Sequence, residues 1–337
     1  MKKAALAAAT GARIADALAM PAHWYYDTRE LAALFGRVDS YLPPPQHHTG
    51  SILWRSSYEP REPEFDILGG EREQWGRRGV HYHRNLLPGE NTLNLKLMNL
   101  VLALVDEIGG YDRQEYIRRY RAFMLAPSGH RDTYVEECHR GFFENLKRGV
   151  PAARAAVEEK HIGGMVPVVP LYARLRALGE SHEEARREVL DHVSVTHAGA
   201  RVESAADTLI QIAAELLEEP EDGPQGLSRL STVLGAHLEG QDLEYLRGPI
   251  ARLAATEAPP RVIGPRYSPA CYLEDSMPAT FYLALRYADR PAEGLIENVM
   301  AGGDNCHRGA VLGALYGLAG GTSLFPDAWI EGLRENS

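Results

Sequence analysis

Four polar residues in a row follow a Gly-Gly pair near the end of the sequence: Asp304, Asn305, Cys306 and His307. A carboxylate, an amide, a thiol and an imidazole at this spacing could bind a metal ion, activate water or hold an anion. The residues after them predict a helix, so they would stand at its N-terminus, where free N–H groups and the helix dipole favour negative charge. The alternative is a glycine-rich helix start whose polar residues only cap the helix.

Cys306 and His307 allow two further interpretations. A thiol near an imidazole can form a nucleophilic pair, or both side chains can bind zinc together with a distant histidine. Adjacent residues at a helix start usually point in different directions, and no third zinc ligand stands at a diagnostic spacing. The remaining interpretation is a buried cysteine beside a histidine that hydrogen-bonds to a ligand or to the backbone.

Three further polar clusters lie where the sequence pattern predicts a helix end or a turn. A single Asp or Thr at such a place is most often a cap, so each cluster alone carries little information. The residues of interest in these clusters are Asp16, His23, Glu90, Asn91, Thr92, Thr196 and His197.

Almost all the elements that would position these clusters are helices. Small residues over 4–19 predict a thin helix that packs closely on both sides, and Gly309, Gly313 and Gly317 share one face of the C-terminal helix. Such a glycine face lets another backbone approach, at about 1 kcal/mol of helix propensity per glycine relative to alanine. No sustained period-two run predicts a sheet. Further helices are expected over 92–108, 168–178, 199–218, 226–238, 242–255, 276–288, 292–300, 308–319 and 327–334.

Helix starts are also predicted from an N-cap acceptor three residues before a carboxylate. A proline in the first turn is a second signal, and it predicts a helix from Pro151 through Glu159. The three capping pairs are Asp112 with Glu115, Thr133 with Glu136, and Ser181 with Glu184.

Residues 39–89 differ from the rest because prolines, glycines, aromatics and histidines are mixed there without helical periodicity. A long irregular segment inside a compact domain is usually functional or disordered, and its tryptophans and tyrosines argue against full disorder. We expect a substrate loop whose aromatics stack on a ligand. The alternatives are a surface excursion packed by its own aromatics, or an oligomer contact.

The composition limits the classes of partner. The chain has 337 residues, and 45% of them are hydrophobic. Its formal net charge is -10, and it has no run of Lys or Arg. This charge argues against nucleic acid as the main partner. No stretch is apolar enough for a membrane span. Three widely spaced cysteines without a CxxC pair suit a reducing compartment. The start resembles a short signal peptide but is weakly hydrophobic and interrupted by Arg13 and Asp16, so we expect a cytoplasmic protein.

In this order and at these distances, the four clusters together resemble the ADP-ribosylglycohydrolase family. That family includes the dinitrogenase reductase-activating glycohydrolase, the ADP-ribosylarginine hydrolases and the J1 crystallins. The resemblance spans roughly residues 4 to 321. The matching segments are Gly11 to Pro21, Gly163 to Leu171, Thr196-His197, Asp275 to Ala279, and Gly302-Gly303-Asp304 with the helix beyond it. In the first segment, Ala15 and Ala19 stand where the family has glycines, and the second segment lacks the family's arginine.

The resemblance implies a single all-α domain over residues 1–337 with a ligand cleft at converging helix ends. It also implies cleavage of an N- or O-glycosidic bond to ADP-ribose in a small molecule or an ADP-ribosylated substrate. Family members generally use two Mg²⁺ or Mn²⁺ ions held by carboxylates, which can orient ribose hydroxyls and activate water.

This sequence departs from the family at the metal motifs. Asn91 and Cys306 stand where carboxylates are expected, and His307 stands where a threonine is expected. The carboxylates that remain at these motifs are Glu90 and Asp304. Because thiol and imidazole ligands favour softer metals than Mg²⁺, we expect either one divalent ion held by Glu90, Asp304 and water, or a site without metal.

Two classes of function follow from the motifs. In the first, Glu90 or Asp304 acts as general base on water that attacks the anomeric carbon. Helix N-termini near Asn91 and Asn305 would hold phosphates, and the ligand cleft would be lined by Asp16, His23, Thr196, His197, Cys306 and His307. In the second, the cleft binds ADP-ribose without turnover, or the protein is structural like a crystallin. A hydrolase that works without metal through Glu90, Asp304 and His307 is a third, related hypothesis. The sequence leaves the oligomeric state open.

Overall fold

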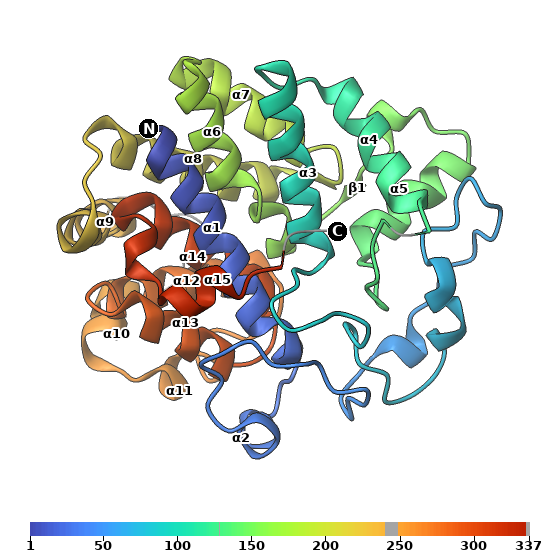
Figure 1. Cartoon of the computed structure of the whole chain (residues 1–337), viewed down its shortest axis with the longest axis horizontal. Helices are drawn as coiled ribbons and strands as arrows, with labels where there is room; N and C mark the ends of the chain where they lie inside the picture. Colours follow the sequence, from blue (N-terminus) through green and yellow to red (C-terminus); the bar gives the residue numbers. More distant parts are fainter. Residues whose placement is uncertain (128, 240–248, 335–337) are drawn as a thin grey trace.

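Two helices from opposite ends of the chain form the centre of the molecule. The computed structural model describes residues 1–127, 129–239 and 249–334. In it, α1 (Lys2–Ala19) and α14 (Asn305–Gly320) lie side by side, the first drawn in blue and the second in red (Figure 1). Every residue of α14 is buried. A Cβ added at Gly11 would lie 2.0 Å from the carbonyl oxygen of Gly313, so the two backbones touch where the sequence supplies glycines.

Replacing Gly313 by alanine tests this backbone contact. The new Cβ would lie 2.2 Å from the carbonyl oxygen of Gly11, and backbone cannot yield as a flexible side chain can. We expect Gly313→Ala to lower the free energy of unfolding by about 3 kcal/mol, measured by urea denaturation. The matched control is Gly235→Ala in another helix, where the added Cβ meets nothing within 4 Å. That control should gain up to about 1 kcal/mol from helix propensity, and equal midpoints for the two variants would contradict the packing argument.

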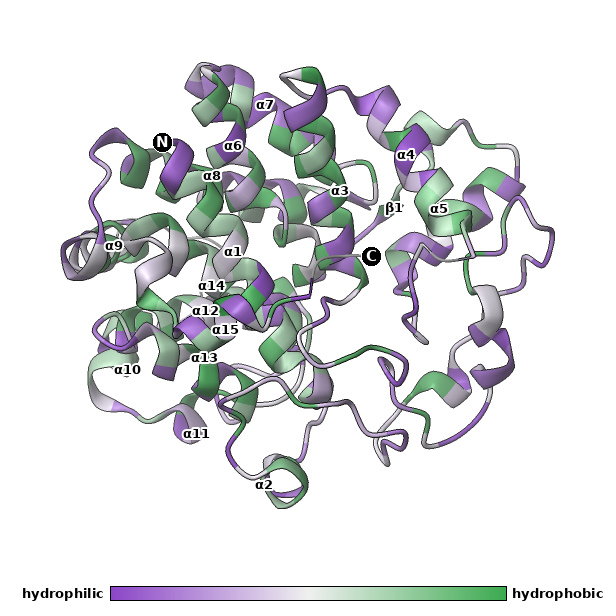
Figure 2. Cartoon of the chain, in the orientation of Figure 1, coloured by the Kyte–Doolittle hydropathy of each residue, from purple (hydrophilic) through white to green (hydrophobic). Residues whose placement is uncertain are grey.

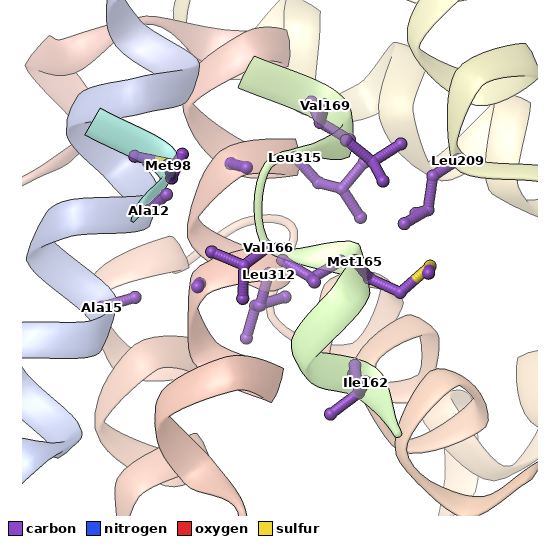
Figure 3. Close-up of a cluster of buried hydrophobic side chains, with 14 of the residues drawn as sticks. Ala12, Ala15, Met98, Ile162, Met165, Val166, Val169, Leu209, Leu312 and Leu315 are labelled. Atoms are coloured by element: carbon purple, nitrogen blue, oxygen red, sulfur yellow. The ribbon is translucent and has the colours of Figure 1, made fainter. Parts of the chain in front are cut away.

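The remaining helices surround this central pair (Figure 1). Apolar side chains of Ala12 and Ala15 from α1 and of Leu312 and Leu315 from α14 meet others from the neighbouring helices in a buried cluster (Figure 3). The other helices are α2 (Thr28–Phe35), α3 (Leu93–Ile108), α4 (Arg113–Leu125), α5 (Glu137–Lys147), α6 (Val168–Leu178), α7 (His182–Val193), α8 (Ala200–Glu218), α9 (Gly223–Glu239), α10 (Ile250–Thr256), α11 (Pro259–Val262), α12 (Leu273–Arg286), α13 (Pro291–Met300) and α15 (Asp327–Glu331).

The predicted all-α class is confirmed, with one small addition. A pair of two-residue strands, β1 (Val157–Glu158) and β2 (His197–Ala198), runs parallel with Val157 opposite His197. The predicted helix over 151–159 is therefore wrong. Only Ala152–Arg154 forms a 3-10 turn, because the chain beyond it is drawn into pairing with β2, a contact that local sequence does not reveal.

Two of the three predicted capping pairs are confirmed. Ser181 forms a complete capping box with Glu184 at the start of α7, and the Asp112 side chain accepts a hydrogen bond from the Glu115 N–H at the start of α4. The third prediction is wrong, because α5 begins only at Glu137. Thr133 donates its hydroxyl to Glu71 Oε2, 3.0 Å away, so its side chain serves a contact with another segment rather than a cap.

Residues 39–89 are irregular, as predicted, and form the lower right of the view in Figure 1. Their only helical pieces are the 3-10 turns Leu53–Arg55 and Gly69–Gln74. Trp75 ties the segment to the body by donating its indole N–H to the carbonyl oxygen of Thr133, 2.9 Å away. Of the helix expected over 242–255, residues 242–248 lie outside the described part of the chain.

The polarity of the elements follows their position. The outer helices α4 and α7 carry both hydrophilic and hydrophobic stretches (Figure 2), as amphipathic surface helices do. Within 1–127, 129–239 and 249–334, no helix is both long and apolar enough to cross a membrane. The expectation of one domain over 1–337 stays a prediction.

Candidate functional site

Asp304 is the centre of the candidate site, and a glycine turn places it there. Gly302 and Gly303 both have positive φ, 66° and 65°. A Cβ at Gly302 would lie 2.2 Å from the carbonyl oxygen of Tyr25, and one at Gly303 would lie 1.9 Å from that of Pro269. Glycine is therefore required at both positions by conformation and by space. The turn delivers Asp304 as the N-cap of α14, where its side chain accepts a hydrogen bond from the His307 N–H.

Two imidazole rings converge on the Asp304 carboxylate. His23 Nε2 lies 3.0 Å from Asp304 Oδ1, and His307 Nδ1 lies 2.9 Å from the same oxygen and 3.0 Å from Oδ2. All three side chains are at least 97% buried. Burial alone would raise the pKa of Asp304, but His307 and then His23 hold it well below the usual value. The carboxylate is therefore ionised.

The two rings respond differently to the same carboxylate. Burial lowers the pKa of His23 to about 3, although Asp304 opposes the shift. For His307, burial also opposes the charge, but Asp304 and then Glu136 outweigh it and raise the pKa to about 10. His307 is therefore the cation of the cluster, and Asp304 is its anion.

A second layer of polar groups extends the cluster on both sides. Behind His23, its Nδ1 lies 2.7 Å from His83 Nε2, and His83 Nδ1 lies 2.6 Å from Asp132 Oδ1. These partners are buried, and the pKa of Asp132 is lowered by His83 against the effect of burial. The result is a continuous chain of contacts from Asp132 through two imidazoles to Asp304.

On the other side, the Asn94 amide connects His307 with Glu136. Its nitrogen lies 2.9 Å from His307 Nε2 and 2.8 Å from Glu136 Oε2, and its oxygen lies 3.0 Å from His139 Nε2. A doubly protonated His307 needs an acceptor at Nε2, which Asn94 supplies when its oxygen is turned toward that ring. The Asn94 amide therefore couples the protonation state of His307 to the hydrogen bonding of Glu136.

Glu136 stands between the cluster and an open pocket. Its Oε1 lies 3.6 Å from His307 Nδ1, and its side chain is 16% exposed. It lines both a cavity of about 10 Å³ beside His23 and His307 and a pocket of about 420 Å³. About one water molecule fits the smaller space. The sequence does not reveal this role, because the position of Glu136 predicts a capping residue. Nor does it reveal Asp132 and Asn94, because no neighbouring residues mark them as part of a site.

The larger pocket combines aromatic surface with polar groups. His197 lies on its wall, 95% buried, and its Nε2 has no hydrogen-bond partner within the described residues. Thr196 Oγ1 lies 2.9 Å from His197 Nδ1 and so orients the ring. The aromatic wall is formed by Trp24, Tyr26, Tyr82, Tyr134 and Tyr272.

A wider cleft of about 940 Å³ adjoins this pocket through shared wall residues, among them Glu159 and His161. His161 Nδ1 contacts Glu159 Oε2, and hydrogen bonds with Cys271 and then Glu159 raise the pKa of His161 to about 11 in spite of burial. The basic side chains that line the cleft are Arg140, Arg148, Lys160 and Arg201.

Glu90 has a different environment from Asp304. Its Oε1 lies 2.8 Å from Lys96 Nζ, and its Oε2 contacts Arg131 and accepts a hydrogen bond from the Leu87 N–H. Three groups of potential ligands in the described part of the chain bring their donor atoms within 4.8 Å of one another, and Glu90 belongs to none of them. Its role as base or metal ligand stays a prediction.

The other predicted site residues around α1 bond mainly to one another. Asp16 is fully buried and accepts hydrogen bonds from the Asn91 amide, 2.9 Å away, and from the Thr92 N–H and hydroxyl, 2.8 and 2.6 Å away. Burial raises the pKa of the Asp16 carboxyl above its ordinary value. Cys306 directs its buried thiol at the Asp16 carbonyl oxygen, 3.7 Å away. These contacts join α1, α3 and α14.

Asn305 also bonds to the protein. Its amide nitrogen lies 3.1 Å from each of the carbonyl oxygens of Ala22 and Val299. Its Oδ1 has no partner in the described residues. Phosphate binding near Asn91 and Asn305 stays a prediction, and both amide nitrogens already donate to protein oxygens.

A family model described as ADP-ribosylglycohydrolase matches residues 1–337. Among curated proteins, none matches this sequence. A solved structure named "ADP-ribosylglycohydrolase-related protein complex" is similar with a TM-score of 0.56 at 20% sequence identity, over 100% of this chain and 95% of that chain. At this identity the likeness to the solved structure concerns the fold.

Proposed function

The chain belongs to the ADP-ribosylglycohydrolase family, and from this premise we propose that it hydrolyses a glycosidic bond of an ADP-ribosyl or related ribosyl substrate. The observation that carries the proposal is the pocket of about 420 Å³ in which Glu136 faces the open space with the Asp304 cluster behind it. A carboxylate at a pocket wall, backed by buried charged groups, is suited to acid–base work on a bound sugar.

The shape and chemistry of the two adjoining spaces support a nucleotide-like substrate. Aromatic rings such as Tyr82 and Tyr134 offer flat surfaces for a base. The basic residues of the neighbouring cleft, such as Arg140 and Lys160, suit a diphosphate. The two spaces share Glu159, His161 and Tyr272 on their walls, so one extended ligand can reach both.

In the proposed reaction, water attacks the anomeric carbon and the bond to the leaving group breaks through an oxocarbenium-like transition state. The Glu136 carboxylate stabilises the positive charge that develops on the ribose, then takes the proton of the attacking water and passes it to the leaving group. Asp304 is fully buried and acts through His307, which it keeps protonated and oriented. Glu90 is a supporting residue in this scheme because Lys96 and Arg131 neutralise it.

The residues present do not fit the pair of Mg²⁺ or Mn²⁺ ions that the family implies. The Asn91 amide nitrogen donates to Arg13 O and Asp16 Oδ2, and the Cys306 thiol points at a backbone carbonyl. The Glu90 carboxylate is already paired with the cationic side chains of Lys96 and Arg131. The Asp304 carboxylate is also already paired. Two hard cations that need several oxygen ligands lack those ligands here, so no step of the proposed reaction runs through them.

Glu136→Gln tests the proposal. We expect kcat for release of ADP-ribose from an ADP-ribosylated substrate to fall about 100-fold, because the amide cannot accept the water proton. The matched control is Glu137→Gln, the adjacent residue, which lines the same pocket but is exposed. Release would be followed by chromatography over arginine-, serine- and nucleobase-linked substrates. Equal rates in the parent and Glu136→Gln would remove Glu136 from the mechanism.

Binding without turnover is the second candidate function. It is favoured by one observation, the engagement of Glu90, Asn91 and Cys306 in contacts within the protein. Micromolar binding of ADP-ribose in calorimetry, with no product from any substrate class, would support it. Product formation that depends on Glu136 would exclude it.

A further inference from the structure

We infer that His23, Asp304 and His307 form a binding site for a single first-row transition-metal dication of the Zn²⁺ type. Their ligand atoms lie within 4.8 Å of one another, and all three side chains are buried. Two imidazole nitrogens and one carboxylate are a donor set that zinc and its neighbours bind well and Mg²⁺ binds poorly. The inference deepens the proposed function, on which its catalytic meaning rests, but its test does not require turnover.

The geometry around Asp304 is the first argument. Both rings point a nitrogen at the same oxygen, Oδ1, from 3.0 and 2.9 Å. Donor atoms bound to one ion at about 2.0–2.1 Å are spaced by roughly this amount from each other. Binding of an ion between the three atoms therefore requires these two hydrogen bonds to open and the side chains to move apart around the ion.

The second argument is the support behind His23. Metal-bound histidines almost always donate the other ring N–H to a carboxylate, carbonyl or similar group. His23 Nδ1 faces His83 Nε2 at 2.7 Å, and His83 Nδ1 faces Asp132 Oδ1 at 2.6 Å. The nitrogen of His23 that remains, Nε2, is the one that faces Asp304.

The proposed ion would lie next to the pocket of the proposed reaction. The small space beside His23 and His307 is lined by Trp24, Tyr134 and Glu136, and these three residues also line the open pocket.

Two competing ligand groups are less suited. The group of His23, His83 and Cys306 depends on a buried thiol that already points at the Asp16 carbonyl and contains no carboxylate. The group of Glu136, Cys138 and His139 contains a single imidazole. The group around Asp304 alone combines two rings with a buried ionised carboxylate.

The test uses the full-length protein freed of metal by a chelator. Equilibrium dialysis with ZnCl2, MnCl2 and MgCl2, followed by elemental analysis, should give one Zn²⁺ per chain and no Mg²⁺. Co²⁺ should give the visible absorption of a site with two nitrogen ligands. His23→Gln and His307→Gln should each weaken Zn²⁺ binding at least about 100-fold, and His83→Gln, which acts through His23, about 10-fold. His192→Gln, a buried histidine outside the three groups, should bind Zn²⁺ like the parent.

No Zn²⁺ on the folded parent protein would overturn the inference, as would variants at His23 and His307 that bind Zn²⁺ as tightly as the parent. Two Mg²⁺ per chain would overturn it as well. Circular dichroism of each variant separates lost ligands from lost fold, and a misfolded glutamine variant would be replaced by His→Asn at the same position. Zn²⁺ binding with no glycosidic turnover would leave the metal site standing and remove the proposed reaction. Turnover in the metal-free protein, with no bound Zn²⁺, would do the reverse.

Discussion

Asp304→Asn is expected to reduce turnover by at least about 10³-fold, the largest effect of any single substitution in the site. The Asp304 carboxylate is hydrogen-bonded to both His23 and His307. An amide in its place keeps one acceptor oxygen and replaces the other with an NH2 group that only donates, so at least one of the two rings faces a donor. The charge that raises the pKa of His307 is lost as well, and both the cation and its orientation disappear from the site.

The same substitution is expected to lower the free energy of unfolding by about 3 kcal/mol. Burial lowers the pKa of the Arg308 guanidinium. The Asp304 carboxylate opposes this shift most strongly, because it favours the charged form of Arg308. The matched control is Asp112→Asn, because Asp112 is also an N-cap that accepts a backbone N–H, but at the exposed start of α4. Asparagine is nearly as good a cap as aspartate, so this control should retain stability and turnover.

Steady-state kinetics and urea denaturation on both variants measure the two effects. If Asp304→Asn and Asp112→Asn behave alike, Asp304 is only a cap, and the site must be sought elsewhere. If Asp304→Asn loses stability but keeps kcat, the residue is structural, and the pocket works through Glu136 without it.

Acid unfolding is the second large effect. Burial lowers the pKa of several histidines in the folded protein, and three of them outside the Asp304 cluster are His48 and His197, lowered to about 4, and His192, lowered to about 3. In the unfolded chain each has an ordinary pKa near 6.5. Between these values the unfolded state binds more protons, so stability falls as the pH is lowered below 6.5.

The size of this effect follows from linkage. Each of the three histidines contributes about 1.4 kcal/mol per pH unit between its two pKa values. At pH 5 the sum is about 6 kcal/mol, comparable to the whole stability of an average domain. We therefore expect cooperative unfolding between pH 6 and 4.5, followed by circular dichroism and tryptophan fluorescence.

His192→Gln provides the check on this prediction. The variant lacks one proton acceptor of the unfolded state, so the slope of stability against pH below 6.5 should decrease by about 1.4 kcal/mol per pH unit. Equal slopes in the parent and His192→Gln would mean that the buried histidines do not control acid stability.

The helical core was predictable because its signals are local. The small residues of 4–19 and the glycines of the C-terminal helix announce a close helix pair, and α1 and α14 make that pair. Helix ends were least certain where another segment takes over. Thr133 bonds to Glu71 instead of capping, and Val157 pairs with His197, and neither partner is visible from neighbouring residues.

The site was predictable in part for the same reason. Asp304, His23 and His307 belong to clusters whose residue types stand out, and the structure brings these three together. The contact of His23 with Asp304 spans 281 positions, and that of Asn94 with His307 spans 213. Asp132, Asn94 and Glu136 enter only through such long-range contacts. The contact of Glu90 with Arg131 likewise joins residues 41 positions apart.

The glycine contact between α1 and α14 also has a kinetic meaning. These helices are the first and the next to last along the chain, so the central pair of the fold cannot form on the ribosome until about residue 320 has been synthesised. Contacts of such high sequence separation slow folding. During synthesis, the alanine face of α1 therefore stays without its packing partner α14. The site also stays incomplete, because Asp304 belongs to the same late segment.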